Sequence, residues 1–437
     1  MKIYYITFGC KVNSYETAAM RQCFIEAGFE DALSMDCADI FVINSCTVTA
    51  ESDSKLMQTI RRLKRDYPEK TVMLTGCFPQ AYPDKARGSC GADIITGTRN
   101  RLGAVNMLNE YLNEKKRLFR VEDISKINAF EPLSVSDIPG HTRAFVKIQD
   151  GCCRHCTYCI IPKSRGKICS KPPSDIIAEV RGLAQNGYRE IVFVGINLAF
   201  YGAGMGIRLA DAVEATAGVD GIERVRLSSL EPEMITDEDL KRLSAIKEFC
   251  PSFHLSLQSG CAETLKAMNR CYTPDEYEAL VDRIRCIFPD CAVTTDIMTG
   301  FPGETDENHR KSMDFAEKIG FSDIHVFPYS QRKGTAADRL TCQIPMDVRK
   351  QRAAQMSALG GKLRQKYLES LVGKVYPVLF EREKSPFFHG GYSPNYAYVK
   401  ILTKNSEKSL RKQIFYVKID KIEDCCCVGH IVDDICQ

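Results

Sequence analysis

Hydrophobic and polar residues form three different patterns along the chain. In residues 1–128, short apolar runs alternate with longer segments in which apolar side chains recur every three or four positions. The short runs predict buried strands, and the longer segments predict amphipathic helices. Because strand and helix alternate, we expect a parallel sheet with helices on its faces. The strand runs are KIYYITF, DIFVIN, TVMLTG and ADIITG.

The same alternation returns in residues 141–371. Six strand runs are separated by helical patterns, and a long helix follows from about Met346 to Leu371. Six strand–helix units are too few for a closed barrel of eight, so we expect a partial, open barrel. The segment EPLSVSDIPG, which precedes the first unit, contains two prolines and few apolar residues and is interpreted as a linker. The strand runs are RAFVKIQ, EIVFVGI, RVRLSSL, FHLSLQS, AVTTDIM and DIHVFPY.

The pattern of apolar positions changes again in residues 372–437, where short apolar runs follow one another without helical segments between them. They predict a small antiparallel β domain. The predicted fold class is therefore α/β, with an N-terminal parallel-sheet domain (1–128), a central partial (β/α)6 barrel (141–371) and a C-terminal β domain (372–437). The C-terminal runs are KVYPVLFERE, AYVKILT, QIFYVKID and VGHIV.

The amino-acid composition is that of a globular protein and gives no sign of a membrane protein. Hydrophobic content of 44% and charged content of 26% are ordinary for a globular protein. No apolar run approaches the roughly 18 residues of a membrane span, and the N-terminus lacks the features of an export signal. We therefore expect a cytoplasmic protein without a membrane partner. The net charge of +3 permits nucleic-acid binding without arguing for it, and nothing points to DNA.

Cysteine is the unusual residue, with 21 in the chain. In a reducing compartment, spaced cysteines indicate metal binding or catalysis rather than disulfides. Cys10, Cys46 and Cys77 each follow a predicted parallel strand by one or two residues. Carboxyl ends of parallel strands meet at one edge of a sheet, so the three thiols could jointly hold an iron–sulfur cluster with one iron left open. The alternative is three half-buried loop cysteines.

The stretch DGCCRHCTYC holds four more cysteines in two competing registers. Cys153, Cys156 and Cys159 form C-x2-C-x2-C, but the fourth cysteine of a ferredoxin motif and the second ligand pair of a zinc site are both missing. Cys152, Cys156 and Cys159 form C-x3-C-x2-C, which needs only three protein ligands. That register leaves the fourth iron to a small chelating molecule.

The stretch GCCRHCTYCIIPKSRG resembles the cluster loop of radical S-adenosylmethionine enzymes, and with Arg165 and Gly166 it is similar to the methylthiotransferases in particular. The resemblance covers almost the whole chain. The runs TFGCKVNSYET, VINSCTVT and VMLTGCFPQ resemble the N-terminal domain of that family, and DIMTGFPGET and HVFPYSQRKGTAA resemble its core. The terminal β domain occupies the place of the family's TRAM-type RNA-binding module.

This resemblance implies two [4Fe–4S] clusters and S-adenosylmethionine as cofactors. Cys152, Cys156 and Cys159 would hold the cluster that binds S-adenosylmethionine, which leaves Cys153 as a bystander. The auxiliary cluster, which carries the sulfur, would be held by Cys10, Cys46 and Cys77. A radical derived from the cofactor would open a C–H bond such as adenine C2. No catalytic residue is assigned beyond these ligands.

Five further residues are candidates for binding S-adenosylmethionine because each follows a predicted strand. Gly195 and Asn197 end FVGIN, where related enzymes use the backbone to hold the methionyl amine. Glu231 follows RLSSL and could hold the ribose or the amine, and Gln258 and Ser259 follow FHLSL. An ordinary strand end or a surface carboxylate would explain the same residues.

The family divides by substrate. TFGCKVNSYET and GYSPNYAYV are most similar to the group that converts N6-threonylcarbamoyladenosine at position 37 of tRNA to its 2-methylthio derivative. The expected partners are a tRNA anticodon stem-loop and an electron donor such as flavodoxin or ferredoxin. The alternatives are isopentenyladenosine in tRNA, an aspartate of a ribosomal protein, or a non-radical iron–sulfur protein that binds RNA or transfers electrons.

Basic and aromatic residues near the C-terminus could hold RNA, because cations bind phosphates and aromatic rings stack on unpaired bases. A solvated loop with core tyrosines would explain them equally well. The residues are Lys404, Lys408, Arg411 and Lys412, with Tyr392, Tyr396 and Tyr398 nearby.

Overall fold

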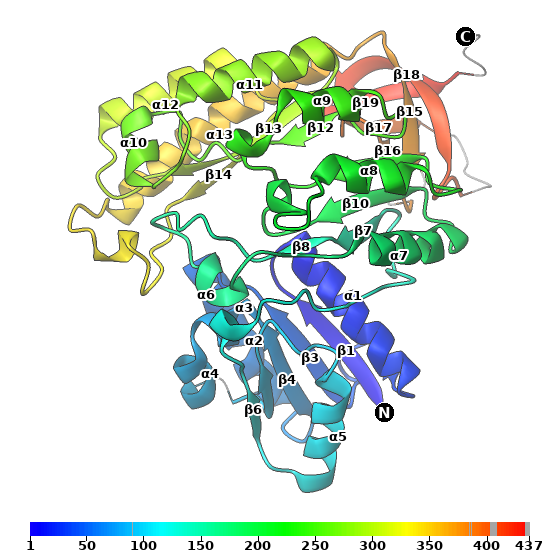
Figure 1. Ribbon diagram of the computed structural model, residues 1–437, viewed down its shortest axis with the longest axis vertical. Helices are drawn as coiled ribbons and strands as arrows, with labels where there is room; N and C mark the ends of the chain where they lie inside the picture. Colours follow the sequence, from blue (N-terminus) through cyan, green and yellow to red (C-terminus); the bar gives the residue numbers. More distant parts are fainter. Residues whose placement is uncertain (90, 384, 386, 403–408, 433–437) are drawn as a thin grey trace.

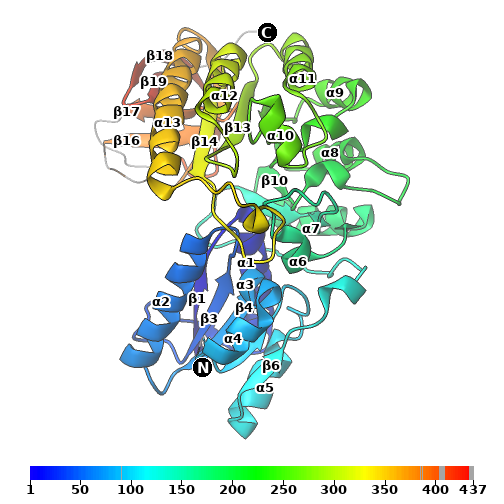
Figure 2. The same cartoon turned by 90° about the vertical axis from the view of Figure 1, so that its left-hand side faces the viewer.

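The computed structural model describes residues 1–89, 91–383, 385, 387–402 and 409–432. A parallel sheet formed by the N-terminal residues lies at one end of the molecule (Figure 1). The central strands and a small β-barrel lie at the other end, and the view at right angles shows the same arrangement (Figure 2). The predicted fold class is confirmed, with the exceptions described below.

The N-terminal sheet has six parallel strands in the order β2-β1-β3-β4-β5-β6. β3 and β4 are buried along their whole length, as expected for strands covered on both faces. The two edge strands, β2 and β6, are too short to produce a hydrophobic pattern and were not predicted. The strands are β1 (Lys2–Thr7), β2 (Glu30–Asp31), β3 (Ile40–Ser45), β4 (Thr71–Gly76), β5 (Ile94–Thr96) and β6 (Leu118–Arg120).

Helices cover both faces of this sheet. On one face, Phe24 of α1 and Leu108 of α5 pack against Ile40. On the other face, Leu56 and Ile60 of α2 pack against the opposite side of the central strands. The helices are α1 (Lys11–Glu26), α2 (Ala50–Asp66), α3 (Cys77–Ala81), α4 (Pro83–Ser89) and α5 (Ala104–Glu114).

The central part contains two three-stranded parallel sheets, β11-β10-β7 and β12-β13-β14. Parallel bridges from Val225 to Phe249 and from Leu230 to Leu255 join them. The six predicted strands therefore follow one another around an open barrel, and within the described residues β7 and β14 are not paired. The strands are β7 (Ala144–Lys147), β10 (Glu190–Val194), β11 (Arg224–Leu227), β12 (Ser252–His254), β13 (Ala292–Thr299) and β14 (Asp323–Pro328).

Helices form the outer layer of this barrel. Two of them begin with reciprocal capping boxes, Thr236 with Asp239 and Thr273 with Glu276, which satisfy the first free backbone N–H groups. The helices are α7 (Pro173–Gln185), α8 (Leu209–Ala217), α9 (Asp237–Ser244), α10 (Ala262–Ala267), α11 (Pro274–Ile287), α12 (Asp306–Ile319) and α13 (Met346–Glu369). Shorter elements at the strand ends are β8 (Gln149–Asp150), α6 (Ile161–Arg165), β9 (Cys169–Ser170), and the 3-10 turns η1 (Ile124–Lys126), η2 (Leu198–Phe200), η3 (Pro232–Met234) and η4 (Ala337–Arg339).

The segment interpreted as a linker, residues 131–140, has no regular secondary structure but is firmly packed. Leu133, Val135 and Ile138 are buried in the central core. The Tyr15 hydroxyl of α1 donates to the Leu133 carbonyl at 2.8 Å. The segment therefore fastens the N-terminal sheet to the central barrel and is not a loose tether.

The C-terminal strands close into a barrel in the order β15-β16-β17-β19-β18. One pair, β17 with β19, is parallel, so the barrel is not wholly antiparallel as the pattern suggested. A Cβ on Gly429 would lie 2.0 Å from the Lys418 carbonyl oxygen, so only glycine allows this close approach. The strands are β15 (Val375–Phe380), β16 (Phe388–Tyr392), β17 (Tyr398–Leu402), β18 (Ile414–Glu423) and β19 (Cys426–Ile431).

Among the described residues, no helix is long and apolar enough to cross a membrane.

Candidate functional site

Cys10, Cys46 and Cys77 lie at the carboxyl ends of three neighbouring strands. Cys10 follows β1 and is the N-cap of α1, Cys46 directly follows β3, and Cys77 directly follows β4 and begins α3. The loops touch one another, because a Cβ on Gly9 would lie 2.7 Å from the Cys46 Cβ. Gly9 also has a φ of +105°, which favours glycine. The three thiols therefore gather at one sheet edge.

The thiols of this first group interact electrostatically with one another and with Arg165 of α6. Burial raises the pKa of Cys46, and it raises the pKa of Cys77 to about 12. The Arg165 guanidinium opposes both increases in pKa, whereas Cys10 adds to both and Cys46 adds to that of Cys77. A bound cation would stabilise Cys46 and Cys77 as thiolates.

Cys152, Cys156 and Cys159 form a second group in the loop that follows β8. The Cys159 N–H donates to the Cys156 carbonyl at 3.0 Å, which closes a tight turn. Burial raises the pKa of Cys159 to about 12, and the Cys156 and Cys152 thiols add to this. Arg270 Nη1 donates to Cys156 Sγ at 3.4 Å. Cys153 is exposed.

The donor chemistry of both groups fits a [4Fe–4S] cluster with three protein ligands. Within the described residues, no three His, Cys, Asp or Glu side chains are arranged around a single metal ion. A cubane cluster instead takes each thiolate on a different iron. One arginine lies beside each group, and its positive charge complements the negative charge that three thiolates bring.

A buried ionic network links α1, which follows Cys10, to β7 and α6, which flank the second group of cysteines along the chain. Its centre is Glu16 of α1, which accepts from Arg101 Nη2 at 2.7 Å, from Lys147 Nζ at 2.7 Å and from Arg165 Nη1 at 2.5 Å. Although burial raises the pKa of Glu16, the three cations hold it at about 2. Arg165 Nη2 also donates to Asn13 Oδ1 at 2.6 Å, beside the loop of Cys10. The network thus connects the cluster loop of the barrel to the edge of the N-terminal sheet.

Gly195 and Asn197 follow β10 and lie close to the second group. A Cβ on Gly195 would lie 3.0 Å from the Gln149 side chain, so the backbone is tightly approached there. The Asn197 N–H donates to Gln149 Oε1 at 2.8 Å. Its side-chain amide is buried next to the Cys152 thiol. Burial raises the pKa of that thiol, and the interaction with the Asn197 amide lowers it.

Glu231, Gln258 and Ser259 also lie at strand ends, with different surroundings. Glu231 is a largely buried carboxylate paired with Arg270, and burial raises its pKa. Gln258 has a φ of +68°, rare for a side chain of its size, and its buried Oε1 has no partner in the described part of the chain. Ser259 is buried, and its hydroxyl already accepts from the Cys261 N–H at 3.2 Å.

A cavity of about 560 Å³ opens beside Gly195 and is bordered by all three parts of the molecule. Asn197, Glu231, Gln258 and Ser259 do not line it. The N-terminal domain contributes Cys10 and Lys11, and the C-terminal barrel contributes Tyr396. The central strands supply a largely polar wall. That wall includes Gly195, Arg226, Ser228, Ser229, Ser252, His254, Thr294, Asp296, Asp323 and His325.

Tyr396 is the aromatic residue of the cavity wall. It has a φ of +66° and stacks on Tyr392 with ring centroids 4.8 Å apart. Arg226 and Arg143 lie over its ring at 4.6 and 5.1 Å from the centroid, and Lys11 Nζ at 5.9 Å. The barrel thus presents an aromatic ring, surrounded by cations, to the cavity.

The described residues of the predicted basic cluster, Arg411 and Lys412, do not line this cavity. Lys404 and Lys408 lie outside the described residues. Arg411 donates to the His141 carbonyl at 3.2 Å, and Lys412 donates to the Asn186 carbonyl at 3.1 Å. These two residues therefore contact the central part of the chain.

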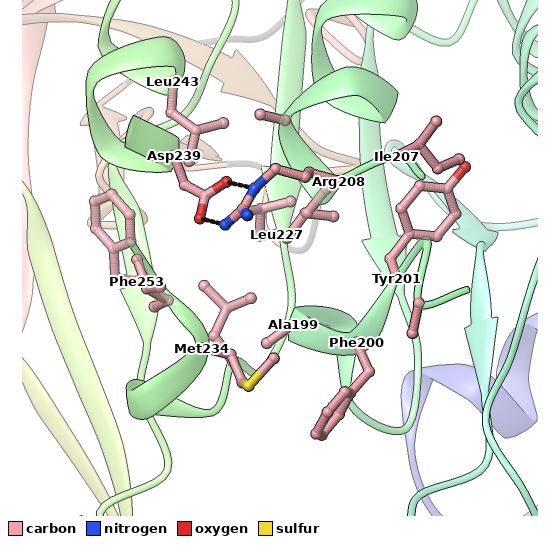
Figure 3. A pocket seen from close by; sticks show the side chains of 15 residues that line it. Ala199, Phe200, Tyr201, Ile207, Arg208, Leu227, Met234, Asp239, Leu243 and Phe253 are labelled. Carbon is pink, nitrogen blue, oxygen red and sulfur yellow. Dashed lines mark hydrogen bonds and ion pairs between the residues drawn. The ribbon is translucent and has the colours of Figure 1, made fainter. Parts of the chain in front are cut away.

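A second cavity, of about 190 Å³, lies between η2, η3 and the helices α8 and α9 (Figure 3). Its lining is mainly apolar and includes Phe200, Leu227 and Phe253. Arg208 Nε donates to Asp239 Oδ1 at 2.7 Å on one wall. None of the cysteines of the two groups lines it, so the polar cavity is the candidate site.

The fold and the site define a radical S-adenosylmethionine enzyme. The model of the Radical SAM superfamily matches residues 146–316, and that of Uncharacterized protein family UPF0004 matches residues 2–97. Among solved structures, the radical S-adenosylmethionine methyltransferase TsrM from Kitasatospora setae shares the fold, with a TM-score of 0.54 and 14% identity over 74% of this chain and 72% of TsrM.

Curated relatives cover nearly the full length. The threonylcarbamoyladenosine tRNA methylthiotransferase MtaB of Bacillus subtilis is 37% identical over 95% of this chain and 93% of its own. A tRNA-2-methylthio-N(6)-dimethylallyladenosine synthase of Thermotoga petrophila is 34% identical over 97% of this chain and 95% of its own. The chain belongs to the radical S-adenosylmethionine tRNA methylthiotransferase family. It is an enzyme that uses S-adenosylmethionine and iron–sulfur chemistry on tRNA.

Three residues of the site were missed or undervalued in the sequence. Arg165 entered the sequence analysis only as part of the motif that resembles the family, and it is fully buried and paired with Glu16. Arg270 and Lys11 were not singled out. Their one visible signal is position, because Lys11 directly follows Cys10 and Arg165 ends the helix after the cysteine loop.

Proposed function

We propose that this enzyme converts N6-threonylcarbamoyladenosine at position 37 of tRNA to its 2-methylthio derivative, with two [4Fe–4S] clusters. The observation that supports this most strongly is the common placement of two cysteine groups. The first group lies at the carboxyl ends of parallel strands, the second lies in the loop after β7 and β8, and a buried ionic network links α1 to β7 and α6, the elements beside them. Cys10 and the strand-end residue Gly195 border the same cavity, which could hold the base between the two groups.

The proposed ligand sets are Cys10, Cys46 and Cys77 for the auxiliary cluster and Cys152, Cys156 and Cys159 for the other. Cofactors of this kind supply one-electron chemistry that can open a C–H bond too weakly acidic for a side-chain base. The protein's part is to hold the partners. Gln258 offers a buried unpaired amide oxygen to S-adenosylmethionine, and Asn197 places a buried amide beside the Cys152 thiol. Gly195 allows the Gln149 side chain to pack against the backbone of this strand end.

Glu231 and Ser259 are weaker candidates for cofactor contacts. Glu231 is already paired with Arg270, and the Ser259 hydroxyl already accepts a hydrogen bond. We propose that Glu231 mainly orients Arg270 beside Cys156, and that Ser259 mainly fixes the loop that begins α10.

The polar cavity favours the threonylcarbamoyl substituent over the isopentenyl one. The threonylcarbamoyl arm carries a hydroxyl, a carboxylate and amide groups, which need hydrogen-bond partners once they leave water. His254 and Asp296 lie 3.2 Å apart on the wall, with Thr294 and Ser252 beside them. An isopentenyl group could form no hydrogen bond with this wall. Four relatives at 33–37% identity carry the threonylcarbamoyladenosine name.

The anticodon stem-loop is the proposed RNA partner, because its unpaired bases can be splayed out and stacked on aromatic residues such as Tyr396. A one-electron donor such as flavodoxin or ferredoxin is the proposed redox partner.

Mass spectrometry of tRNA nucleosides from cells with and without the gene tests the proposal. Loss of the 2-methylthio nucleoside with accumulation of threonylcarbamoyladenosine is expected. Re-expression of the natural chain should restore the product, and a chain with Cys152, Cys156 and Cys159 all changed to alanine should not. Loss of only the isopentenyl product would overturn the substrate. No change in either nucleoside would favour the ribosomal-protein aspartate or a non-radical role.

A further inference from the structure

We propose that Lys11 is the specificity-determining residue of the cavity and binds the carboxylate of the threonylcarbamoyl arm. This inference rests on the proposed substrate. It concerns only which residue recognises the substituent, and the reaction itself does not depend on it.

Lys11 differs from the other cations around Tyr396 in lacking a counter-ion. Arg226 is paired with Glu190 at 2.8 Å and also donates to the carbonyl of Pro394. Arg143 is paired with Glu381 at 3.0 Å. In the described part of the chain, the ammonium group of Lys11 forms no ion pair with a carboxylate, and it lies 5.9 Å from the centroid of the Tyr396 ring.

The position of Lys11 supports binding of a ligand anion. The side chain lines the cavity and remains solvent-accessible, so an incoming group can reach it. A charged hydrogen bond in such a partly desolvated place is stronger than one on an open surface.

The carboxylates of the cavity lie on other elements. Asp296 belongs to β13 and is flanked by His254 at 3.2 Å and His325 at 3.9 Å. Asp323 belongs to β14 and is paired with Arg364 at 3.4 Å. An anionic substituent would face carboxylates that are already paired on the β13 and β14 wall and an ammonium group without a carboxylate partner on the wall formed by Lys11. The distribution of charge therefore orients a substrate that carries one carboxylate.

Lys11 also lies where recognition can be linked to chemistry. It directly follows Cys10, the proposed auxiliary-cluster ligand that borders the cavity. A carboxylate held by Lys11 would bring the N6 arm to the same wall as that ligand.

The test compares binding of three synthetic anticodon stem-loops to the iron-loaded enzyme. One carries threonylcarbamoyladenosine, the second carries the same arm with a neutral carboxamide in place of the carboxylate, and the third is unmodified. Natural enzyme, Lys11→Met and Lys11→Arg are compared, and Lys116→Met removes a charge from an exposed position as the matched control. Iron content is measured for each variant.

Natural enzyme and Lys116→Met should prefer the carboxylate RNA over the carboxamide RNA by roughly tenfold, the size of one charged hydrogen bond. Lys11→Met should remove this preference, and Lys11→Arg should keep most of it. If Lys11→Met loses iron, Lys11→Gln takes its place with the same expectation.

Two results would overturn the inference. An unchanged preference in Lys11→Met would assign the carboxylate to another residue. Equal weakening for all three RNAs would mean that Lys11 binds a backbone phosphate. Failure of the proposed substrate looks different, because the natural enzyme would then fail to thiolate the threonylcarbamoyl RNA and would modify an isopentenyl RNA instead.

Discussion

Arg165 and Arg270 each lie beside one group of cysteines and are held there by a carboxylate. Glu16 holds Arg165, and Glu231 holds Arg270. Each guanidinium is therefore fixed in orientation and adds positive charge where thiolates and a cluster bring negative charge. Hydrogen bonds to sulfur and nearby charge are the main means by which a protein sets the reduction potential of a cluster.

Removing the charge of Arg270 should make the neighbouring cluster harder to reduce. In Arg270→Met, Cys156 loses its 3.4 Å donor and Glu231 loses its counter-ion, and both changes disfavour the added electron. The midpoint potential should fall by about 60 mV, which corresponds to roughly 1.4 kcal/mol for one electron. A redox titration followed by electron paramagnetic resonance measures this. Arg285→Met, which removes a donor to the Gly320 carbonyl, is the control; an unchanged potential in Arg270→Met would refute the role.

Single substitutions can also distinguish the two cysteine registers, in which either Cys152 or Cys153 is a ligand together with Cys156 and Cys159. Cys153 is exposed and Cys152 is partly buried beside Asn197. We expect Cys153→Ser to keep all of its iron and its activity. Changing Cys152, Cys156 and Cys159 together to alanine should remove half of the iron, and so should the same change at Cys10, Cys46 and Cys77. The iron content per chain is measured for the three variants. Loss of iron in Cys153→Ser would favour the register in which Cys153 is a ligand.

The sequence predicted what depends on strand order and missed what depends on distant contacts. The proximity of Cys10, Cys46 and Cys77 could be predicted from the sequence, because the carboxyl ends of neighbouring parallel strands share an edge. Glu16 and Arg165 are 149 residues apart, and no periodic pattern relates them. The burial of Arg165 therefore could not be predicted from the sequence, because arginine is usually exposed.

At the level of elements, the buried ion pair between Glu16 and Arg165 connects α1 to α6, while Val12 and Ala18 of α1 belong to the apolar core of the barrel. Breaking one partner of a buried ion pair leaves an uncompensated charge, which costs far more than loss of a surface pair. The contact between the N-terminal sheet and the barrel should therefore depend strongly on Glu16.

Glu16→Gln should destabilise the protein by about 3–5 kcal/mol, because Arg101, Lys147 and Arg165 remain buried without their common carboxylate. Urea unfolding of the iron-free protein measures the change. Glu110→Gln, which breaks a more exposed pair with Arg120, should cost less than about 1 kcal/mol. Similar losses in the two variants would contradict the importance of the network.

Because of the low pKa of Glu16, the protein should lose folding stability in acid. The pKa of Glu16 lies at about 2 in the folded protein and near 4.5 when unfolded, so its contribution is complete above pH 4.5 and is lost as the pH falls toward 2. The shift of about 2.5 pH units corresponds to roughly 3 kcal/mol. Unfolding of the iron-free natural protein should therefore become easier over this range. The dependence should be weaker in Glu16→Gln, and parallel curves for the two proteins would disprove the link.

At the scale of the whole molecule, the cavity exists only because three parts of the chain meet around it. The loop of residues 8–11 comes from the N-terminal sheet, and residues 393–397 come from the C-terminal barrel. Arg224 and Arg226 of β11 secure the barrel through the carbonyls of Pro377 and Pro394. A base bound in the cavity would touch all three parts and should hold them together.

Binding of an anticodon stem-loop should therefore protect two segments far apart in the sequence from hydrogen exchange. We expect slower exchange in residues 8–11 and 393–397, because both lie outside regular strands and border the cavity. Helix α5, at the far end of the N-terminal domain, should be unchanged (Figure 1). Exchange followed by mass spectrometry with and without the RNA measures this. Protection of only the C-terminal barrel would mean that RNA binds there without entering the cavity, whereas protection of both segments is expected only if the base reaches the space between Cys10 and Tyr396.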